Sequence, residues 1–330
     1  MNRPVRLELP TPFAIGSVNA WLFIEPEPIL VDCGQKTPDC IAALESGLAE
    51  HQLKISDLKK IIITHAHVDH AGLAGYLAEN SDAEFWVSEY AWDWVCDLER
   101  MWTERGEFMQ GVARKGGMDS ESIKKMSSSM SRIHQIWEPV PVDRMVRFTT
   151  RTKLQMGGKR WDVIYAPGHT TSQTCFFEPE SGMLISADML LHIAPVPVIE
   201  REPQLNTNGE VKRAPGLLQY MKSLEIFYDL DVTAVYPGHG PEFSEPHRTV
   251  IDRQRKRISM RKEQCFDLVK AGNRTMLGIT NIMYSHFPED SRITGFAMVL
   301  GYLDLLMDEG RVTCAEVEGV WQFKANSGEQ

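Results

Sequence analysis

The residue types that bind metal ions are concentrated in one segment of this chain. Residues 64–72 read THAHVDHAG and directly follow a short apolar run. His65 and His67 are two positions apart and can point the same way from an extended loop, whereas Asp69 and His70 come later and can face a second position. Neutral imidazole nitrogens and carboxylate oxygens are ligands of zinc and other borderline divalent metals. The segment therefore predicts a metal site, the alternative being a histidine-rich solvated loop.

Three later segments repeat one pattern, in which a residue type that binds metals follows an apolar run. They contribute His169 in YAPGHT, Asp188 in LISAD and His239 in VYPGHG. Each segment alone is a weak signal, because a histidine after Pro-Gly is usually a turn residue. Together with the first segment they supply seven ligands, enough for two metal ions that share one carboxylate.

The elements that must position these residues alternate between strands and helices along the first 245 or so residues. Short apolar runs predict β-strands, and residues 38–50 have the apolar spacing of a helix. Most strands end at Gly, Pro, His or Asp, as expected of a sheet that carries its site on loops at one edge. The predicted strands cover residues 20–24, 29–31, 60–63, 85–87, 161–165, 174–177, 183–185 and 233–236, with a hairpin between the first two.

An insertion at about residues 89–138 interrupts this alternation. It is rich in tryptophan and methionine, including Trp92, Trp94 and Met101, and we expect it to be helical. One interpretation is a packed helical cap or a face for homodimerisation. The other is a lid that lines an apolar substrate pocket, since methionine and aromatic side chains make adaptable walls.

A second unit is predicted at residues 248–330, which leaves residues 1–247 as the catalytic domain. Its first helix carries a basic run between Arg253 and Lys262 and ends at Gly272. The predicted elements are helices at 249–271, 275–287 and 293–309, followed by a β-hairpin at 312–323. Three helices and a hairpin, in this order, are typical of a winged helix, which is also a candidate homodimer contact.

The motifs resemble those of the metallo-β-lactamase superfamily of metallohydrolases. The resemblance covers about residues 10–245 and rests on THAHVDHAG, GHT, the aspartate of SAD, and PGHG. It implies an α/β fold, an αββα sandwich with the metals at one edge of two packed sheets. It also implies that Asp32 supports the floor of the site without binding metal. The implied ligands are His65, His67 and His169 for one metal and Asp69, His70 and His239 for the other, with Asp188 bridging both.

The C-terminal elements make the resemblance more specific. A helix, then YPGHGP, a basic helix and a winged helix are similar to the lactamase-β-2-like branch, which includes a mitochondrial endoribonuclease and acyl-carrier thioesterases. The expected cofactors are two divalent metal ions, zinc with iron or manganese as alternatives. A hydroxide that bridges the two metals is expected to attack the substrate. The family also implies a catalytic role for Asp69, which guides the proton of the nucleophile while binding metal.

Two substrate classes stay open at this point. The first is a small-molecule ester or thioester of the acyl-CoA or acyl-carrier type, for which the insertion would supply apolar walls. The alternative is RNA, cleaved by a metal-dependent endoribonuclease whose winged helix and basic run bind phosphates. Against RNA, the predicted recognition helix at 293–309 contains Asp304 and Asp308 but no lysine or arginine. A deep apolar tunnel would favour acyl groups, whereas an open basic trough would favour RNA.

The composition is that of an ordinary globular protein of 330 residues. Lysine and arginine number 35 and aspartate and glutamate 45, so the net charge of −10 argues against bulk electrostatic capture of nucleic acid. No apolar run approaches the roughly 18 residues that span a bilayer. Prolines at positions 4, 10 and 12 interrupt the first 16 residues, which do not resemble a signal peptide. With six cysteines and no C-x-x-C pair, the chain is expected to be cytoplasmic, with no membrane partner.

Overall fold

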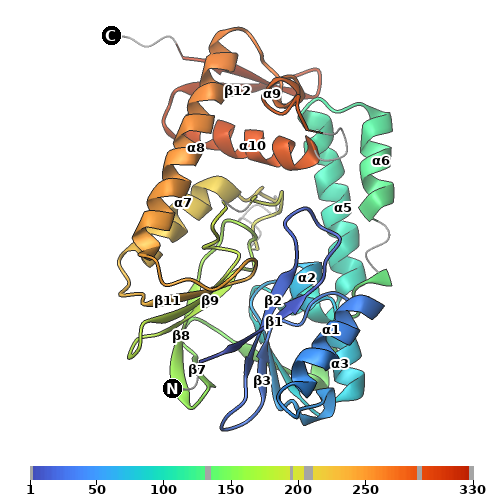
Figure 1. Ribbon diagram of the computed structural model, residues 1–330. Coiled ribbons are helices and arrows are strands. Elements are labelled where there is room, and N and C mark those ends of the chain that lie inside the picture. The colour runs from blue at the N-terminus through green and yellow to red at the C-terminus, as the bar shows by residue number, and fades with distance from the viewer. Residues whose placement is uncertain (1–2, 131–134, 194–195, 204–210, 288–291, 327–330) are drawn as a thin grey trace.

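The computed structural model describes residues 3–130, 135–193, 196–203, 211–287 and 292–326 (Figure 1). Two β-sheets lie face to face, and helices cover the outer face of each. The predicted α/β architecture of two packed sheets between helices is confirmed. Residues 131–134 of the predicted insertion, and short parts of both predicted domains, lie outside the described residues.

The first sheet has six strands. In order across the sheet they are β1 (Val5–Leu9), β2 (Val18–Phe23), β3 (Ile29–Val31), β4 (Lys60–Ile63), β5 (Glu84–Ser88) and β6 (Met145–Phe148). β2 and β3 form the predicted hairpin, in which Trp21 lies opposite Val31. β3 to β6 are parallel, so their carboxyl ends share one edge. This arrangement places Asp32, which follows β3, beside the loop that follows β4.

The second sheet has five strands. In order across the sheet they are β11 (Ala234–Pro237), β10 (Met183–Ala187), β9 (Thr174–Glu178), β8 (Lys159–Tyr165) and β7 (Lys153–Met156). The pairs β7–β8, β8–β9 and β9–β10 are antiparallel, whereas β10 and β11 are parallel. The residues after β10 and after β11 therefore emerge at the same edge, as the positions of Asp188 and His239 require.

Large aromatic side chains fill the space between the two sheets. Phe23 of β2 packs edge-on against Trp161 of β8, with ring centroids 5.6 Å apart. Trp21 contacts Tyr236 of β11 in the same way at 5.0 Å. These side chains are almost fully buried. Such close packing holds the two sheets in one relative position, so the loops at their shared edge start from fixed points.

Amphipathic helices form the outer layers. α1 (Pro38–Ala49) begins with Thr37, whose hydroxyl accepts a hydrogen bond from the backbone N–H of Cys40 at 3.3 Å, and it lies with α3 (Ala74–Asn80) on the first sheet. α7 (Gly216–Tyr228) and α8 (His247–Lys270) cover the second sheet. Among the described residues, each helix is too short or too polar to cross a membrane.

The inserted segment is helical, as predicted. It consists of α4 (Trp92–Cys96), α5 (Leu98–Lys115) and α6 (Ser120–Met130). In Figure 1, α5 runs along the side of the molecule opposite α8 and reaches the C-terminal elements. There Lys115 pairs with Glu316 at 2.9 Å, and the backbone N–H of Leu277 donates to the carbonyl of Gly116 at 3.0 Å. The insertion therefore connects the first sheet to the C-terminal part.

The C-terminal elements follow the predicted order. After α8 come α9 (Met276–Met283), α10 (Arg292–Asp308) and a hairpin of β12 (Val312–Val317) and β13 (Val320–Ala325). Their apolar side chains belong to one cluster with those of the second sheet and α7. α10 packs closely on α7 at Gly301. A Cβ at this position would lie 2.6 Å from Cβ of Leu217, so only glycine fits there. The assignment to a winged-helix domain, and the boundary at residue 247, stay predictions.

Three strands lack a sequence prediction, namely β1, β6 and β7. β1 and β7 lie at sheet edges and alternate buried with exposed residues, and each is five residues or fewer. β6 has four residues and lies at the edge of the first sheet, next to β5. Short alternating edge strands have few consecutive apolar residues, so the search for apolar runs does not find them.

A buried ion pair joins α10 to the rest of the protein, and its disruption should destabilise the fold. Arg213 donates two hydrogen bonds to Asp304, whose side chain is only 6 % exposed. Arg213→Met leaves this carboxylate buried without a cation, and we expect the free energy of unfolding to fall by about 3 kcal/mol in urea titrations. Lys153→Met, which breaks the exposed pair with Asp162, should cost less than about 1 kcal/mol. Equal losses in the two variants would contradict this account.

Candidate metal centre

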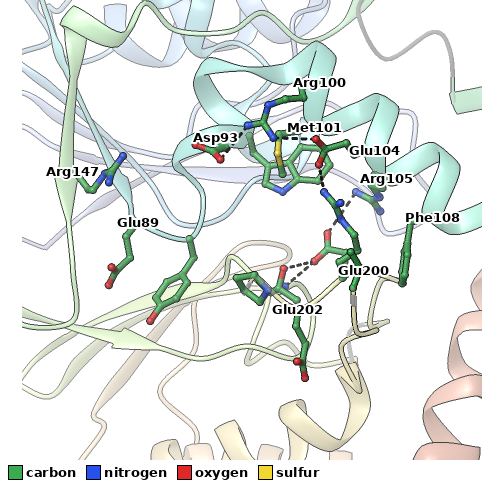
Figure 2. A pocket seen from close by; sticks show the side chains of 16 residues that line it. Glu89, Asp93, Arg100, Met101, Glu104, Arg105, Phe108, Arg147, Glu200 and Glu202 are labelled. Atoms are coloured by element: carbon green, nitrogen blue, oxygen red, sulfur yellow. Dashed lines mark hydrogen bonds and ion pairs between the residues drawn. The ribbon is translucent and has the colours of Figure 1, made fainter. Parts of the chain in front are cut away.

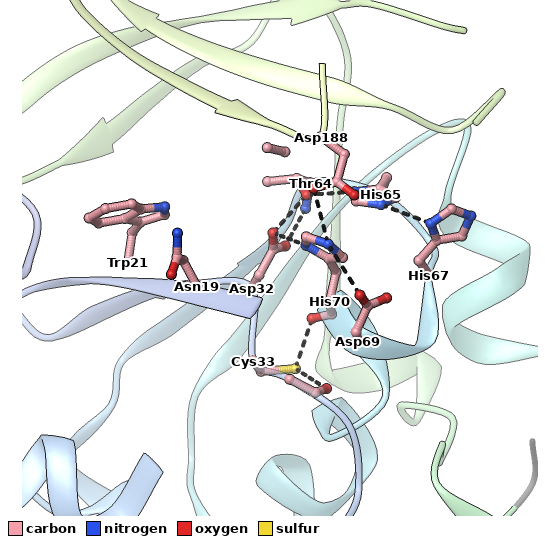
Figure 3. Close-up of polar contacts among 12 residues, drawn as sticks. Asn19, Trp21, Asp32, Cys33, Thr64, His65, His67, Asp69, His70 and Asp188 are labelled. Atoms are coloured by element: carbon pink, nitrogen blue, oxygen red, sulfur yellow. Dashed lines mark hydrogen bonds and ion pairs between the residues drawn. The ribbon is translucent and has the colours of Figure 1, made fainter. Parts of the chain in front are cut away.

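All seven predicted ligands lie at one edge of the two sheets, and Figure 3 shows five of them. The loop after β4 and the short helix α2 (Val68–Ala71) contribute four ligands. The segments after β8, β10 and β11 contribute one each. Within each group the candidate ligand atoms lie no more than 4.8 Å from one another. The first group is His65, His67, His169 and Asp188, and the second is Asp69, His70 and His239.

The first group surrounds Nδ1 of His67. This nitrogen lies 3.2 Å from Nε2 of His65 and 3.0 Å from Nε2 of His169. Nε2 of His169 is in turn 3.3 Å from Oδ2 of Asp188. Bonds of 2.0–2.1 Å in a tetrahedral zinc site separate neighbouring ligand atoms by roughly 3.3 Å. The spacing of this group therefore fits a single cation.

The second group shares Asp188 with the first. Nε2 of His239 lies 3.4 Å from Oδ2 of Asp69 and 3.6 Å from Oδ2 of Asp188. Nε2 of His70 lies 3.4 Å from Oδ1 of Asp188 and 4.0 Å from Oδ2 of Asp69. Asp188 thus contacts histidines of both groups and lies where a bridging carboxylate is expected.

Hydrogen bonds on the far side of the rings determine which nitrogens carry protons. Figure 3 shows Asp32 accepting from the hydroxyl of Thr64 at 2.8 Å and from Nδ1 of His70 at 2.7 Å. Because the Thr64 hydroxyl donates to Asp32, it accepts from Nδ1 of His65 at 3.0 Å. Both histidines then have a proton on Nδ1 and a lone pair on Nε2, which faces the centre.

Two backbone carbonyls orient the remaining rings in the same way. Nδ1 of His169 donates to the carbonyl of Val196, and Nδ1 of His239 donates to the carbonyl of Ser17, both at 2.8 Å. Their Nε2 atoms therefore also carry lone pairs toward the centre. This pattern is the usual support for metal-bound histidines.

The residues present fit two divalent cations. Nε2 of His70 and Oδ1 of Asp188 are buried and have no hydrogen-bond partner among the residues that the structure describes. Such orphaned acceptors are costly unless a positive group satisfies them. The backbone also leaves room, because a Cβ on Gly238 would lie 2.1 Å from Oδ1 of Asp188. Imidazole and carboxylate ligands of this kind suit zinc, iron or manganese.

The histidine pKa values differ between the two groups. Burial, together with the neighbouring His70 and His67, lowers the pKa of His65 well below its ordinary value, and burial and His169 do the same for His67. In the second group burial acts in the same direction, but the carboxylates of Asp188 and Asp69 raise the pKa of His239 to about 9. The pKa of His70 is likewise raised despite burial, chiefly by Asp188. In the second group, a proton therefore competes with a cation for the same lone pairs.

Helices α7 and α8 hold the loop that carries Asp188. The hydroxyl of Tyr220 lies 3.0 Å from the carbonyl of Met189 and 2.6 Å from Oε1 of Gln254. Nε2 of Gln254 donates to the carbonyl of Leu191 at 2.6 Å. Gln254 belongs to α8, so the C-terminal part of the chain contributes directly to the position of the shared carboxylate.

Polar residues after His169 link the centre to its surroundings. The hydroxyl of Ser172 accepts from the backbone N–H of Ala66 at 3.1 Å, which fixes the loop between two ligands. The backbone N–H and the hydroxyl of Thr171 both donate to Oε2 of Glu200 at 2.8 Å. Glu200 is almost fully buried and in turn lies 3.7 Å from Arg105 of α5.

A pocket of about 620 Å³ adjoins this region (Figure 2). The insertion lines it with residues of α4 and α5, and whether this segment is a lid or a face for homodimerisation stays open. The expectation of an apolar wall is wrong, because most of the labelled side chains are charged. Trp94 and Trp137 stack on each other in the core, at a centroid distance of 6.3 Å, and are nearly buried. The pocket is thus neither an apolar tunnel nor a basic trough.

Several supporting groups had no functional prediction. Thr64 directly precedes His65, so its position was a usable signal. No sequence signal marks the carbonyls of Ser17 and Val196, because every residue type provides a backbone carbonyl. Glu200 and Arg105 come from segments 95 positions apart in the sequence, and only the fold brings them together.

Comparison with known proteins identifies the family. The family model described as metallo-beta-lactamase superfamily matches residues 14–239, which is more than half of the chain. The chain belongs to the metallo-β-lactamase superfamily. The match includes all seven candidate ligands, and the predicted resemblance is confirmed.

Relatives of this superfamily resemble the chain over its whole length. The probable metallo-hydrolase YqjP of Bacillus subtilis (strain 168) is 27 % identical over 94 % of this chain and 93 % of its own. A beta-lactamase-like protein 2 homolog of Caenorhabditis elegans is 24 % identical over 97 % of this chain and 89 % of its own. The crystal structure of a metallo-beta-lactamase family protein from Thermus thermophilus has a TM-score of 0.80 at 24 % identity, covering 99 % of each chain. The protein is therefore a metallohydrolase whose C-terminal elements belong to the shared fold.

Metal binding at neutral pH should release protons from the second group. His239, with a pKa of about 9, is protonated below that pH, and a cation must displace this proton. We expect calorimetry of zinc binding, in buffers of different ionisation enthalpy, to show proton release at pH 7 that declines toward pH 9, while the affinity rises. Binding that is independent of pH between 6 and 9 and releases no proton would contradict this prediction.

Removing the acceptor behind His70 should weaken metal binding. Asp32→Asn keeps the size of the side chain, and asparagine tolerates the φ of 60° at this position. Its amide cannot replace all the acceptor sites that Thr64 and His70 use, so we expect an affinity loss of about 10- to 100-fold in competition with a chromogenic chelator. Asp162→Asn, on the exposed side of β8, should leave the affinity unchanged. Equal affinities for both variants would show that Asp32 does not support the centre.

Proposed function

We propose that this metallohydrolase is a binuclear enzyme that hydrolyses small ester or thioester substrates. The observation that carries the proposal is the convergence of five imidazoles and two carboxylates, with their lone pairs facing one another, beside the pocket. His65, His67 and His169 would hold one cation and Asp69, His70 and His239 the other, with Asp188 shared. Zinc is the first choice for both positions, and iron and manganese suit the same ligands.

Two bound cations would supply Lewis-acid polarisation of a carbonyl and would lower the pKa of a water from 15.7 to around 7. The residues of the chain hold the reacting groups in place. Asp69 is nearly buried, and although burial raises its pKa, the neighbouring His70 and His239 lower it below the ordinary value. Its carboxylate is therefore ionised at neutral pH and suited to accept and guide the proton of the nucleophile.

The pocket favours a small polar acyl substrate over a long alkyl chain. Its wall alternates acidic and basic side chains, among them Glu89, Asp93, Arg100 and Arg105, with Met101 and Phe108 as apolar neighbours. A long hydrocarbon chain would have to cover charged groups without pairing them, which is unfavourable. Its volume suits a ligand of drug-like size. We therefore propose that the acyl group of the ester or thioester substrate is short or polar.

Charge argues against RNA as the substrate. Five acidic side chains and four arginines line the pocket, so its wall lacks the basic excess that attracts a phosphodiester backbone. The basic run on α8 is partly neutralised within the chain, because Arg253 pairs with Glu245 at 2.6 Å and Lys262 pairs with Glu309. The C-terminal helices and hairpin share one apolar cluster with the second sheet, which supports a role in the fold more than a separate RNA platform.

Hydrolysis assays with the metal-loaded protein test this proposal. We expect turnover of short-chain phenyl esters and thioesters with zinc, iron or manganese, and no cleavage of single-stranded RNA. Asp69→Asn should lower kcat/KM at least about 100-fold, because it removes both a ligand and a proton acceptor. Asp308→Asn, an exposed change on α10, is the control and should retain activity. RNA cleavage without ester turnover would replace this proposal with an endoribonuclease.

A further inference from the structure

One arginine of the pocket differs from the others in how its charge is balanced. Arg100 forms ion pairs with Asp93 and Glu104, as Figure 2 shows, and with Asp97. Arg201 pairs with Glu104 as well. These charges are satisfied within the wall. Two further arginines line the pocket. Arg147 is exposed and lies over the ring of Trp92, without an ion pair to a described residue. Arg105, one helical position after Glu104 on α5, is buried beside Glu200.

Arg105 is buried but makes no hydrogen bond with any described residue. Its side chain is only 12 % exposed, and its Nε is buried without a partner. The single ion pair, to Oε1 of Glu200, is 3.7 Å long, which is beyond hydrogen-bond distance. The other oxygen of Glu200 is occupied by Thr171. The Nε–H of this cation is therefore buried without an acceptor, and Nη1 approaches Glu200 only beyond hydrogen-bond distance.

Two tryptophans hold the Arg105 guanidinium in position. Its Cζ lies 5.7 Å from the ring centroid of Trp94 and 5.4 Å from that of Trp102. Contact with aromatic rings stabilises the charge but provides no acceptor for the N–H groups. A rigidly held planar fork with free donors is the geometry that recognises a carboxylate or a phosphate.

Arg105 also lies close to the metal centre. Its charge is one of the causes that lower the pKa of His67, after burial and His169. It is connected to the ligand loop through Glu200 and Thr171, and Thr171 follows His169 by two residues. Thr171 also lines the pocket, so a ligand group bound to Arg105 would lie next to the loop that carries His169.

We propose that Arg105 binds an anionic group of the substrate, a carboxylate or a phosphate, in a bidentate manner. This inference rests on the proposed function and specifies its substrate class as esters or thioesters that carry an anionic group. Glu89 and Glu202 also line the pocket and have no ion-pair partner among the described residues, which disfavours further negative groups beside these carboxylates. A second negative group would meet these carboxylates.

Direct binding tests the anion site without turnover. Succinate and inorganic phosphate are titrated separately into the metal-free full-length chain by calorimetry, which excludes anion binding to metal and shows which anion is preferred. We expect binding of at least one anion, weakened about 10- to 100-fold in Arg105→Met. Arg105→Lys, which keeps the charge but loses the fork, should be intermediate. The matched control Arg201→Met, which removes an already paired arginine of the same pocket, should bind as the wild type does.

Substrate discrimination tests the same residue in the loaded enzyme. Phenyl half-esters of malonic, succinic and glutaric acid are compared with their neutral methyl phenyl diesters by phenol release. We expect the wild type to prefer the charged member of at least one pair by about 10-fold or more in kcat/KM. Arg105→Met should lose this preference, which is read as the ratio of kcat/KM for the charged and the neutral member of each pair, so that a general loss of turnover does not count as a loss of discrimination. Arg201→Met should retain the preference.

The outcomes separate this inference from the proposed function. Anion binding that depends on Arg105, with no ester turnover by the wild type, would support the anion site and refute the ester hydrolase. Ester turnover without preference for the charged substrate, and anion binding that is absent or unaffected by Arg105→Met, would overturn the role of Arg105. Circular dichroism and thermal melts of each variant show that lost binding does not reflect unfolding.

Discussion

The convergence of electron-pair donors at one buried edge is the constraint on which the rest of this structure depends. Five histidine nitrogens and two carboxylates face one another there, and Nε2 of His70 and Oδ1 of Asp188 make no hydrogen bond within the described parts of the chain. Such an arrangement is unfavourable by itself, because like partial charges repel and buried acceptors lose their hydration. Cations convert the same arrangement into a stable one. The fold therefore has to hold these groups together against their mutual repulsion.

The supporting structure is spread over the whole chain. Asp32 at the end of β3 orients rings on the neighbouring loop, while Ser17 and Val196 orient two others through backbone carbonyls. Gln254 on α8 holds the loop after Asp188. One apolar cluster joins the second sheet to α8, α9 and α10. The C-terminal elements are consequently part of the scaffold of the metal centre, whatever further role they have.

The ligands could be predicted from the sequence because each is a rare residue type directly after an apolar run. THAHVDHAG is dense enough to stand alone, whereas His169, Asp188 and His239 acquire meaning only in combination. The character of the pocket could not be predicted in this way. Tryptophans such as Trp94 and Trp137 are consistent with either a core or a ligand wall. Trp94 stacks on Trp137 and also lines the pocket, where charged side chains form most of the wall. Arg105 has no local signal, since its significance depends on Glu200 and on hydrogen bonds that it does not make.

Anomalous diffraction from crystals of the zinc-loaded protein, recorded on both sides of the zinc absorption edge, tests the central claim most directly. The account predicts two zinc peaks at the sheet edge. One peak should lie among His65, His67 and His169, the other among Asp69, His70 and His239, and Asp188 should reach both. A single peak, or zinc bound elsewhere with these side chains left empty, would contradict it.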